Sequence, residues 1–122
     1  MGAILFKIAT REQWRLAERQ GEFLGAPVDL EDGFIQFSLA HQVRVTAARH
    51  FACATVLLLV RVDGWVLGGS LRYEPSRGGQ HFPHHYAALP LSAVISVEPL
   101  PLGRQGLHIF PDDVDAEAPG LR

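Results

Sequence analysis

The hydrophobic pattern of the chain predicts several short strands, most of them in its second half. A run of Val and Leu over residues 55–62 predicts the most deeply buried strand. Apolar residues over 3–9, interrupted only by Lys7, predict a first strand. Further strands are expected at residues 34–38, 70–74, 93–98 and, at a sheet edge, 107–110.

Local signals predict a first helix directly after the first strand. Thr10 and Gln13 have the spacing of a capping box, in which a hydroxyl and an amide side chain each bind the other residue's backbone N–H. The helix is expected to run to about Gln20 and to end at Gly21, a residue suited to the left-handed position after a helix.

A second helix is expected at about residues 40–52, with Ser38 as its cap and an apolar stripe that includes Val43 and Ala47. Residues 23–31, around Pro27, are expected to form a loop. Two helices and four to six strands make an α+β domain, because the helices are too few to cover both faces of a parallel sheet.

The length of 122 residues is that of one domain, which we expect at residues 1–111. Residues 112–122 are rich in acids and contain Pro119 and Gly120, so a frayed tail is expected there. A hydrophobic content of 48% excludes a chain disordered throughout.

The charge and the apolar runs limit the partners. A net charge of −2 argues against strong binding to nucleic acid or to a membrane surface, which favours basic proteins. The longest apolar run, residues 56–60, is far shorter than the ~20 residues of a membrane span. No signal peptide is recognised at the N-terminus, so a cytoplasmic protein is expected.

The cysteine and histidine content bears on redox and metal chemistry. Cys53 is the only cysteine, which excludes a disulfide within the chain, and its apolar neighbours predict a small buried residue. His81, His84 and His85 lie within five residues, but Pro83 disfavours a helical arrangement and adjacent residues of a strand point to opposite faces. We therefore expect no metal. The alternative that one of the three imidazoles has a role in a pocket is left open.

Several polar residues in the predicted strands have two interpretations. In the strand at 34–38, Gln36 shares a face with Phe34 and Ser38, and its amide faces either solvent or a polar pocket. Lys7 either extends its amine from a strand edge to water or lines a site.

Other polar residues cluster in and before a glycine-rich loop. Gly78 and Gly79 form a turn or, together with Arg77, hold a phosphate or carboxylate. Arg72 and Glu74 share a strand face and predict a surface ion pair.

An ordered set of motifs spans most of the chain: LFKIATREQW, GAPVDLEDGFIQFS, LRYEPSRGG, and FPHHY followed by LPLSAV. This set, over roughly Ile4 to Val97, resembles the small bacterial domain-of-unknown-function family 952. The resemblance implies an ADP-ribosyltransferase-like fold, near the RNA 2′-phosphotransferase branch. That fold has a split, mostly antiparallel sheet and a cleft shaped for NAD.

The resemblance also implies site residues, with a departure from the family pattern at residue 36. The family often has His or Lys at the position of Lys7, and usually His at the position of Gln36. The loss of an imidazole at residue 36 removes a candidate for acid–base chemistry. The family's PHxY segment falls on residues 83–86, which favours His84 and Tyr86 as pocket residues.

The roles implied by the resemblance form one nucleotide site. Lys7 and Gln36 would contact ribose, Phe34 or Tyr86 would stack on a ring, Arg72 and Arg77 would meet phosphates, and Ser38 would support Gln36. Candidate catalytic residues are Gln36, His84 and, to stabilise a ribosyl cation, Glu74.

Three hypotheses for function follow. The first is a domain that binds NAD or a related nucleotide, with NAD as co-substrate of a weak transfer at the nicotinamide ribose. The second is a binding or interaction module that keeps the fold without the chemistry. The third, a histidine-based metal protein, is disfavoured for the reasons given above.

Overall fold

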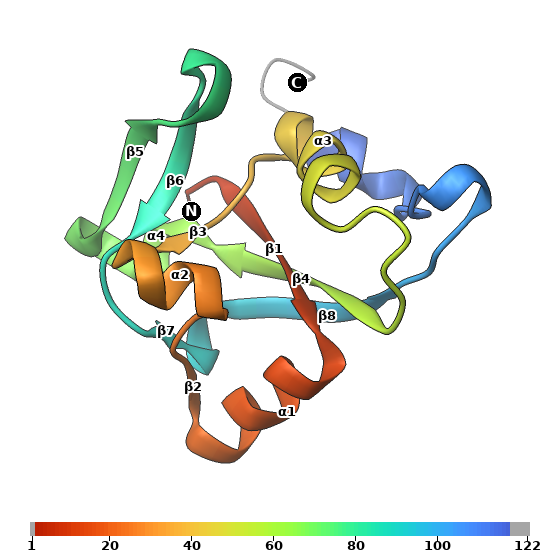
Figure 1. The fold of residues 1–122 in the computed structure, drawn as a ribbon. Helices are drawn as coiled ribbons and strands as arrows, with labels where there is room; N and C mark the ends of the chain where they lie inside the picture. Colours follow the sequence, from red (N-terminus) through yellow and green to blue (C-terminus); the bar gives the residue numbers. More distant parts are fainter. Residues whose placement is uncertain (1, 118–122) are drawn as a thin grey trace.

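The computed structural model describes residues 2–117, apart from the side chains of Arg77 and residues 115–117 (Figure 1). The helices are α1 (Arg11–Gln20), α2 (Pro27–Asp32), α3 (Ala40–His50) and α4 (Gly64–Leu67). The strands are β1 (Ile4–Thr10), β2 (Glu22–Phe23), β3 (Ile35–Gln36), β4 (Leu57–Asp63), β5 (Leu71–Pro75), β6 (His81–His85), β7 (Leu89–Pro90) and β8 (Val94–Leu100).

The strands form three antiparallel sheets. One has the order β1-β4-β8, a second the order β3-β6-β5, and a third pairs β2 with β7. The chain is therefore an α+β domain, as the hydrophobic pattern predicts. In Figure 1 the β5–β6 hairpin extends from the body as an arm.

The two larger sheets meet at a single antiparallel bridge between Phe6 of β1 and Ser38, just after β3. The Phe6 amide donates to the Ser38 carbonyl at 2.8 Å, and the Ser38 amide donates back at 2.9 Å. Next to this bridge, side chains take the place of backbone partners between β1 and β3, which matters for the site described below.

The core lies on both faces of β4, whose residues Leu57–Val62 are all buried. One face packs against Trp14, Phe23 and Leu89, and the other against α3 and Val114. The prediction of a most buried strand at residues 55–62 is confirmed for residues 57–62, whereas Thr55 and Val56 are exposed and precede the strand. Ile35 and Phe37 also lie in the core, as the alternation of residues 34–38 predicts.

The first helix forms as its local signals predict. The Gln13 amide donates to Oγ1 of Thr10, and the Thr10 amide donates to Oε1 of Gln13, both at 3.0 Å. Gly21 follows the helix with φ of 82°, a conformation that glycine adopts without the steric cost of a Cβ.

Two predictions about the middle of the chain are wrong. Residues 23–31 are not a loop, because α2 begins at Pro27, a residue whose fixed φ suits the first position of a helix. Ser38 does not cap α3. The cap is Leu39, whose amide donates to Oε1 of Gln42 at 3.0 Å, while the Ser38 backbone joins the two sheets.

Three further predictions need correction. Cys53 is exposed rather than buried, and its φ of 64° places it in a tight turn after α3. Residues 107–110 contribute one isolated bridge, between Leu102 and His108, instead of an edge strand. The expected tail begins with a 3-10 helix, Asp112–Glu117, which buries Val114 completely; residues 118–122 lie outside the described part.

Among the described residues, no helix combines the length and the apolar character needed to cross a lipid bilayer.

Candidate functional site

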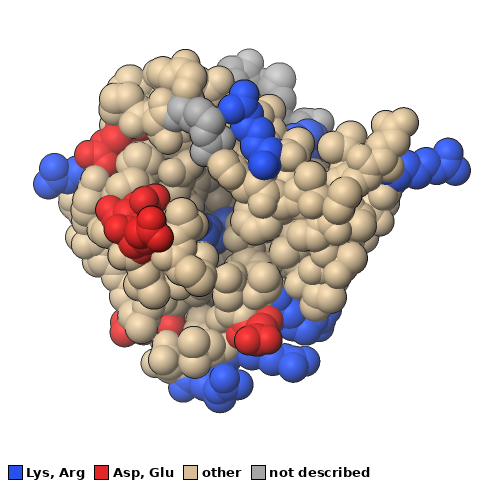
Figure 2. All heavy atoms as spheres, in the orientation of Figure 1, with Lys and Arg blue, Asp and Glu red and all other residues tan. Residues whose placement is uncertain are grey.

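A hollow of about 470 Å³ opens beside the bridge between the two larger sheets. Figure 2 shows it near the centre of the molecule, with basic atoms visible at its floor. It is lined by residues in or next to β1, α1, α2, α3 and β3: Phe6, Lys7, Ile8, Gln13, Ala26, Pro27, Val28, Asp29, Asp32, Gln36, Ser38, Thr46, His50 and Phe51.

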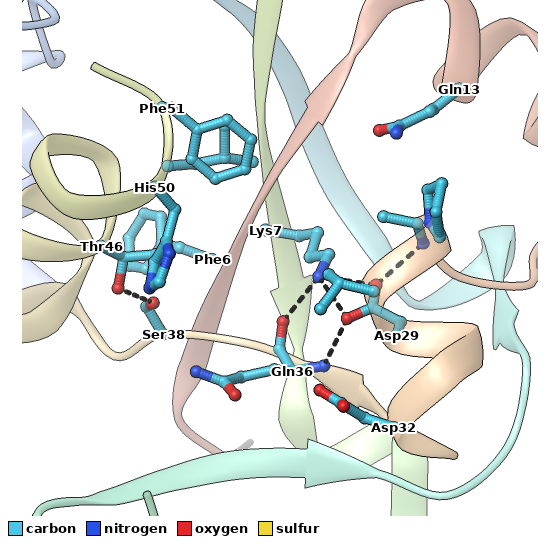
Figure 3. Close-up of a pocket in the computed structure, with 14 residues that line it drawn as sticks. Phe6, Lys7, Gln13, Asp29, Asp32, Gln36, Ser38, Thr46, His50 and Phe51 are labelled. Carbon is cyan, nitrogen blue, oxygen red and sulfur yellow. Dashed lines mark hydrogen bonds and ion pairs between the residues drawn. The ribbon is translucent and has the colours of Figure 1, made fainter. Parts of the chain in front are cut away.

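A buried ion pair between Lys7 and Asp29 lies in this lining (Figure 3). Nζ of Lys7 is 2.8 Å from Oδ2 and 3.1 Å from Oδ1 of Asp29, and it also donates to the backbone oxygen of Gln36 at 2.9 Å. Burial lowers the pKa of Lys7, and the attraction and hydrogen bond of Asp29 oppose that shift.

Asp29 links three elements. Its Oδ2 accepts from the Ala26 amide at the start of α2 (2.9 Å), and its Oδ1 accepts from the Gln36 amide (3.3 Å). The N–H and C=O of Gln36 that face β1 are thus satisfied by Asp29 and Lys7 instead of by a neighbouring strand. The ion pair therefore lies between β1 and β3, next to the hollow, and takes the place of backbone hydrogen bonds between these strands.

The side chains of Gln36 and Ser38 supply polar groups on the same sheet face. Within the described residues, no hydrogen bond involves the side-chain amide of Gln36. Oγ of Ser38 lies 2.8 Å from Oγ1 of Thr46 on α3. The expectation that Ser38 supports Gln36 is wrong in this respect, because the partner of its hydroxyl is Thr46.

A second group of predicted residues lies together on β5, on β6 and the residue after it, and at the residue before β3. Nδ1 of His84 is 2.9 Å from Oε1 of Glu74, and the Tyr86 hydroxyl donates to the same oxygen at 2.6 Å. The Phe34 ring stacks on His84 with centroids 4.0 Å apart. The Arg72 guanidinium lies 5.7 Å from the centroid of Tyr86.

The electrostatics of this group define its protonation. Hydrogen bonds from Tyr86 and His84 hold the pKa of Glu74 below its usual value of 4.5, and the same carboxylate raises the pKa of Tyr86. Glu74 is therefore ionised at neutral pH and accepts from Nδ1–H of His84. Nε2 of His84 is buried and has no hydrogen-bond partner among the described residues, which is uncommon for a native polar atom.

The predicted site residues thus divide into two neighbouring groups. Lys7, Gln36 and Ser38 line the hollow, whereas Phe34, Arg72, Glu74, His84 and Tyr86 are absent from its lining among the described residues. Gln36 connects the groups, because it lies directly opposite His84 in the pairing of β3 with β6. The side chain of Arg77 lies outside the described part of the structure.

Sequence reasoning missed several residues of the lining. Asp29 lies in the segment expected to be a loop, and its partner Lys7 is 22 positions away, so no local pattern connects them. Phe51 belongs to the predicted second helix. The helical periodicity of apolar residues does not show whether such a side chain packs in the core or lines a hollow. A carboxylate three residues after Ala26, the residue that precedes α2, is the one local signal that would have found Asp29.

The remaining histidines take separate positions, as the strand geometry predicts. Nε2 of His85, next to His84 but on the other face, is 3.1 Å from the carbonyl oxygen of Ala88. The described residues contain no group of three or more His, Cys, Asp or Glu side chains able to hold a metal ion.

A comparison with known protein families identifies the family of this chain. Residues 8–97 match the model of a family described as a protein of unknown function (DUF952). The chain belongs to this family.

Solved structures of one relative share the fold. The crystal structure of CC0527 from Caulobacter crescentus is 39% identical, with a TM-score of 0.89 over 93% of this chain and 99% of that one. Its solution NMR structure is 40% identical, with a TM-score of 0.78 over 93% and 95% of the two chains. No curated protein matches.

Proposed function

We propose that the chain binds NAD or a related nucleotide in the hollow beside the Phe6–Ser38 bridge. The observation that carries this proposal is the split between β1 and β3, where Lys7 and Asp29 satisfy the Gln36 backbone and the Gln36 side-chain amide has no partner among the described residues. The family resemblance supports it, because the related fold class, that of the ADP-ribosyltransferases, has a split sheet at its NAD cleft.

The size and lining of the hollow support a small-molecule ligand. Ligand sites are commonly about 300–1,000 Å³ and combine apolar walls with a few polar groups that set orientation. The hollow of about 470 Å³ has aromatic walls at Phe6 and Phe51, with Gln36 and Ser38 as polar groups. Such a volume suits one nucleoside unit, with the rest of a dinucleotide extending to solvent.

Transfer at the nicotinamide ribose is the catalytic extension of this proposal. The bond between C1′ and nicotinamide would break with its electron pair leaving on nicotinamide, and an acceptor would attack the cationic ribose. Glu74 is bound to His84 and Tyr86 outside the lining, so its role as a stabiliser of that cation requires the ligand to reach past Gln36. Gln36 and His84, opposite each other, are the residues through which it would do so.

A second candidate function is a binding module without chemistry. It is favoured by Lys7, whose ammonium is held by Asp29 and the Gln36 backbone, and by the amide at residue 36, which cannot titrate. The variant Gln36→His separates the two candidates. Release of nicotinamide from NAD by that variant, with none from the wild type, would indicate a module derived from an enzyme.

The proposal is tested by NMR titration of the protein with NAD. We expect amide shifts at Lys7, Gln36, Ser38 and Thr46, and a loss of about 1 kcal/mol of binding free energy in Gln36→Ala if the amide binds a ribose hydroxyl. Gln20→Ala, a glutamine outside this lining, is the matched control. A spectrum unchanged by NAD would refute the proposal, and equal affinities of the two variants would refute the role given to the Gln36 amide.

A further inference from the structure

The charges in the hollow are poorly suited to a phosphate group. Among the described lining residues, Lys7 is the only Lys or Arg and His50 is the only histidine, and both carboxylate oxygens of Asp29 bind the Lys7 ammonium. Asp32, exposed in the same lining, adds a second carboxylate. A phosphate placed here would meet a neutralised lysine and a like charge.

The start of α2 does not supply an anion site either. Ala26, Pro27 and Val28 face the hollow, and a helix start ordinarily attracts negative charge. Here the Asp29 carboxylate already accepts from the Ala26 amide, and Pro27 has no N–H. The negative group that this helix end favours is therefore built into the chain.

The hydroxyl groups in the lining have a defined direction. Oγ1 of Thr46 donates its one proton to the carbonyl oxygen of Gln42 at 3.2 Å. In that arrangement the Ser38 hydroxyl donates to Thr46 across their 2.8 Å contact, since Thr46 has no second proton. The lone pairs of Ser38 are left as acceptors, and a ligand O–H is the group that they would bind.

Gln36 complements this acceptor. Its side-chain amide offers one carbonyl oxygen and two N–H donors, and its backbone is fixed by Lys7 and Asp29. A ribose has adjacent hydroxyls that both donate and accept, so they match an amide beside a hydroxyl acceptor. Figure 3 shows Phe6 and Phe51 on the side of the hollow where Ser38 and Thr46 lie, as walls for a flat ring.

We propose that the hollow recognises the nucleoside part of its ligand, through ribose hydroxyls and a neutral or cationic ring, and that phosphates remain in solvent. This inference rests on the proposed function and specifies which part of the nucleotide enters the site. A positively charged pyridinium ring is favoured over a neutral one, because Asp32 lies in the lining and aromatic faces attract cations.

The test compares four probes by calorimetry: nicotinamide riboside, its reduced form, nicotinamide mononucleotide and NAD. We expect nicotinamide riboside to bind within about threefold of the two phosphorylated probes, since a lost phosphate contact would cost tenfold or more. Between roughly 50 and 500 mM salt, over which exposed charge pairs are screened, its affinity should fall by no more than the two- to fivefold contribution of Asp32. The reduced, uncharged riboside should bind about two- to fivefold more weakly than the oxidised one.

Asp32→Asn is the diagnostic variant, because the side chain is exposed and the substitution keeps its size. We expect it to remove the difference between the oxidised and reduced ribosides and to leave the reduced form unaffected. Binding of the mononucleotide and NAD at least about tenfold tighter than the riboside, weakening with salt, would overturn this inference and leave the proposed function intact. Absence of binding by all four probes would refute both.

Discussion

At the scale of single residues, the Lys7–Asp29 pair replaces backbone hydrogen bonds that a neighbouring strand would otherwise make with Gln36. Gln36 turns one edge of β3 toward β1, and its N–H and C=O would be unsatisfied there without the two side chains. The sequence left open whether Lys7 reaches water or lines a site, and the structure gives a third result. Lys7 is buried, holds the backbone of a neighbouring strand and lines the hollow at the same time.

We predict that Lys7→Met destabilises the protein by about 3–5 kcal/mol, because it leaves the Asp29 carboxylate buried without its counter-charge. Chemical denaturation of the two proteins measures the difference in unfolding free energy.

The double variant Lys7→Met with Asp29→Asn is the control for this substitution. It removes both charges, and the Asn oxygen can still accept from the Ala26 amide, so most of the lost stability should return. A single variant as stable as the wild type would contradict the structural role given to the pair.

At the scale of elements, prediction succeeded where local chemistry decides the conformation. The start and end of α1 are set by Thr10, Gln13 and Gly21, all within the element or next to it. The start of α2 is set by Pro27 and by the Asp29 carboxylate, which binds the Ala26 amide. Asp29 is held in place by Lys7 from β1, and a contact at that distance in the chain leaves no local pattern.

Ser38 shows how tertiary structure overrides a local preference. Its hydroxyl is suited to a helix cap, yet its backbone pairs with Phe6, and the cap moves one residue on to Leu39. The sequence predicted the start of this helix to within a residue. It predicted the wrong capping interaction, because the cap is Leu39 with the Gln42 side chain instead of the Ser38 hydroxyl.

We predict that Thr10→Ala lowers the stability by about 1 kcal/mol, since it removes the acceptor for the Gln13 amide at the start of α1. Thermal or denaturant unfolding measures the loss. Thr10→Ser keeps the hydroxyl and should lie close to the wild type. Equal losses in the two variants would show that the methyl group, rather than the hydrogen bond, is responsible.

The 3-10 helix Asp112–Glu117 depends on charge as well as on the burial of Val114. Asp113 binds the buried Arg61 through both carboxylate oxygens, at 2.6 and 3.3 Å, and this contact lowers the pKa of Asp113 from its usual 3.8. Because the folded state holds the ionised form, the contact stabilises the protein above pH 3.8, and that contribution is lost as the pH falls through the lowered value.

We therefore predict that Asp113→Asn is less stable than the wild type at neutral pH, and that the two unfolding free energies converge as the pH falls below about 3.8. Denaturation at a series of pH values measures this convergence. A difference that does not change with pH would mean that the carboxylate charge is not involved.

At the scale of the whole molecule, the two larger sheets differ in how firmly their strands are held in the fold. Strand β4 is bonded to β1 on one side and β8 on the other and is buried on both faces. The β5–β6 hairpin is attached through the two residues of β3, and β5 has exposed residues along its length.

This arrangement predicts the order in which the fold opens. In native-state hydrogen exchange we expect amides of β4 to exchange only through global unfolding, and amides of β5 to exchange through a local opening that needs less free energy. Protection of β5 equal to that of β4 would show that the two sheets unfold as one unit.

The fold class was predictable from the sequence, but the pairing of the strands was not. Strand alternation and two helix patterns indicate α+β, but β1 pairs with β4 across some fifty residues, and hydrophobic pattern does not encode which strands meet. The division of the predicted site into the hollow and the Glu74–His84 group has the same origin. It depends on Gln36 and His84 becoming neighbours through the β3–β6 pairing.

The turn after α3 offers a practical advantage for all of these experiments. Cys53 is the sole cysteine of the chain, its side chain is exposed, and it follows the lining residue Phe51 by two positions. A maleimide dye added to the unaltered protein would attach at one place only. Its emission could then report occupancy of the hollow without the removal of a single native residue.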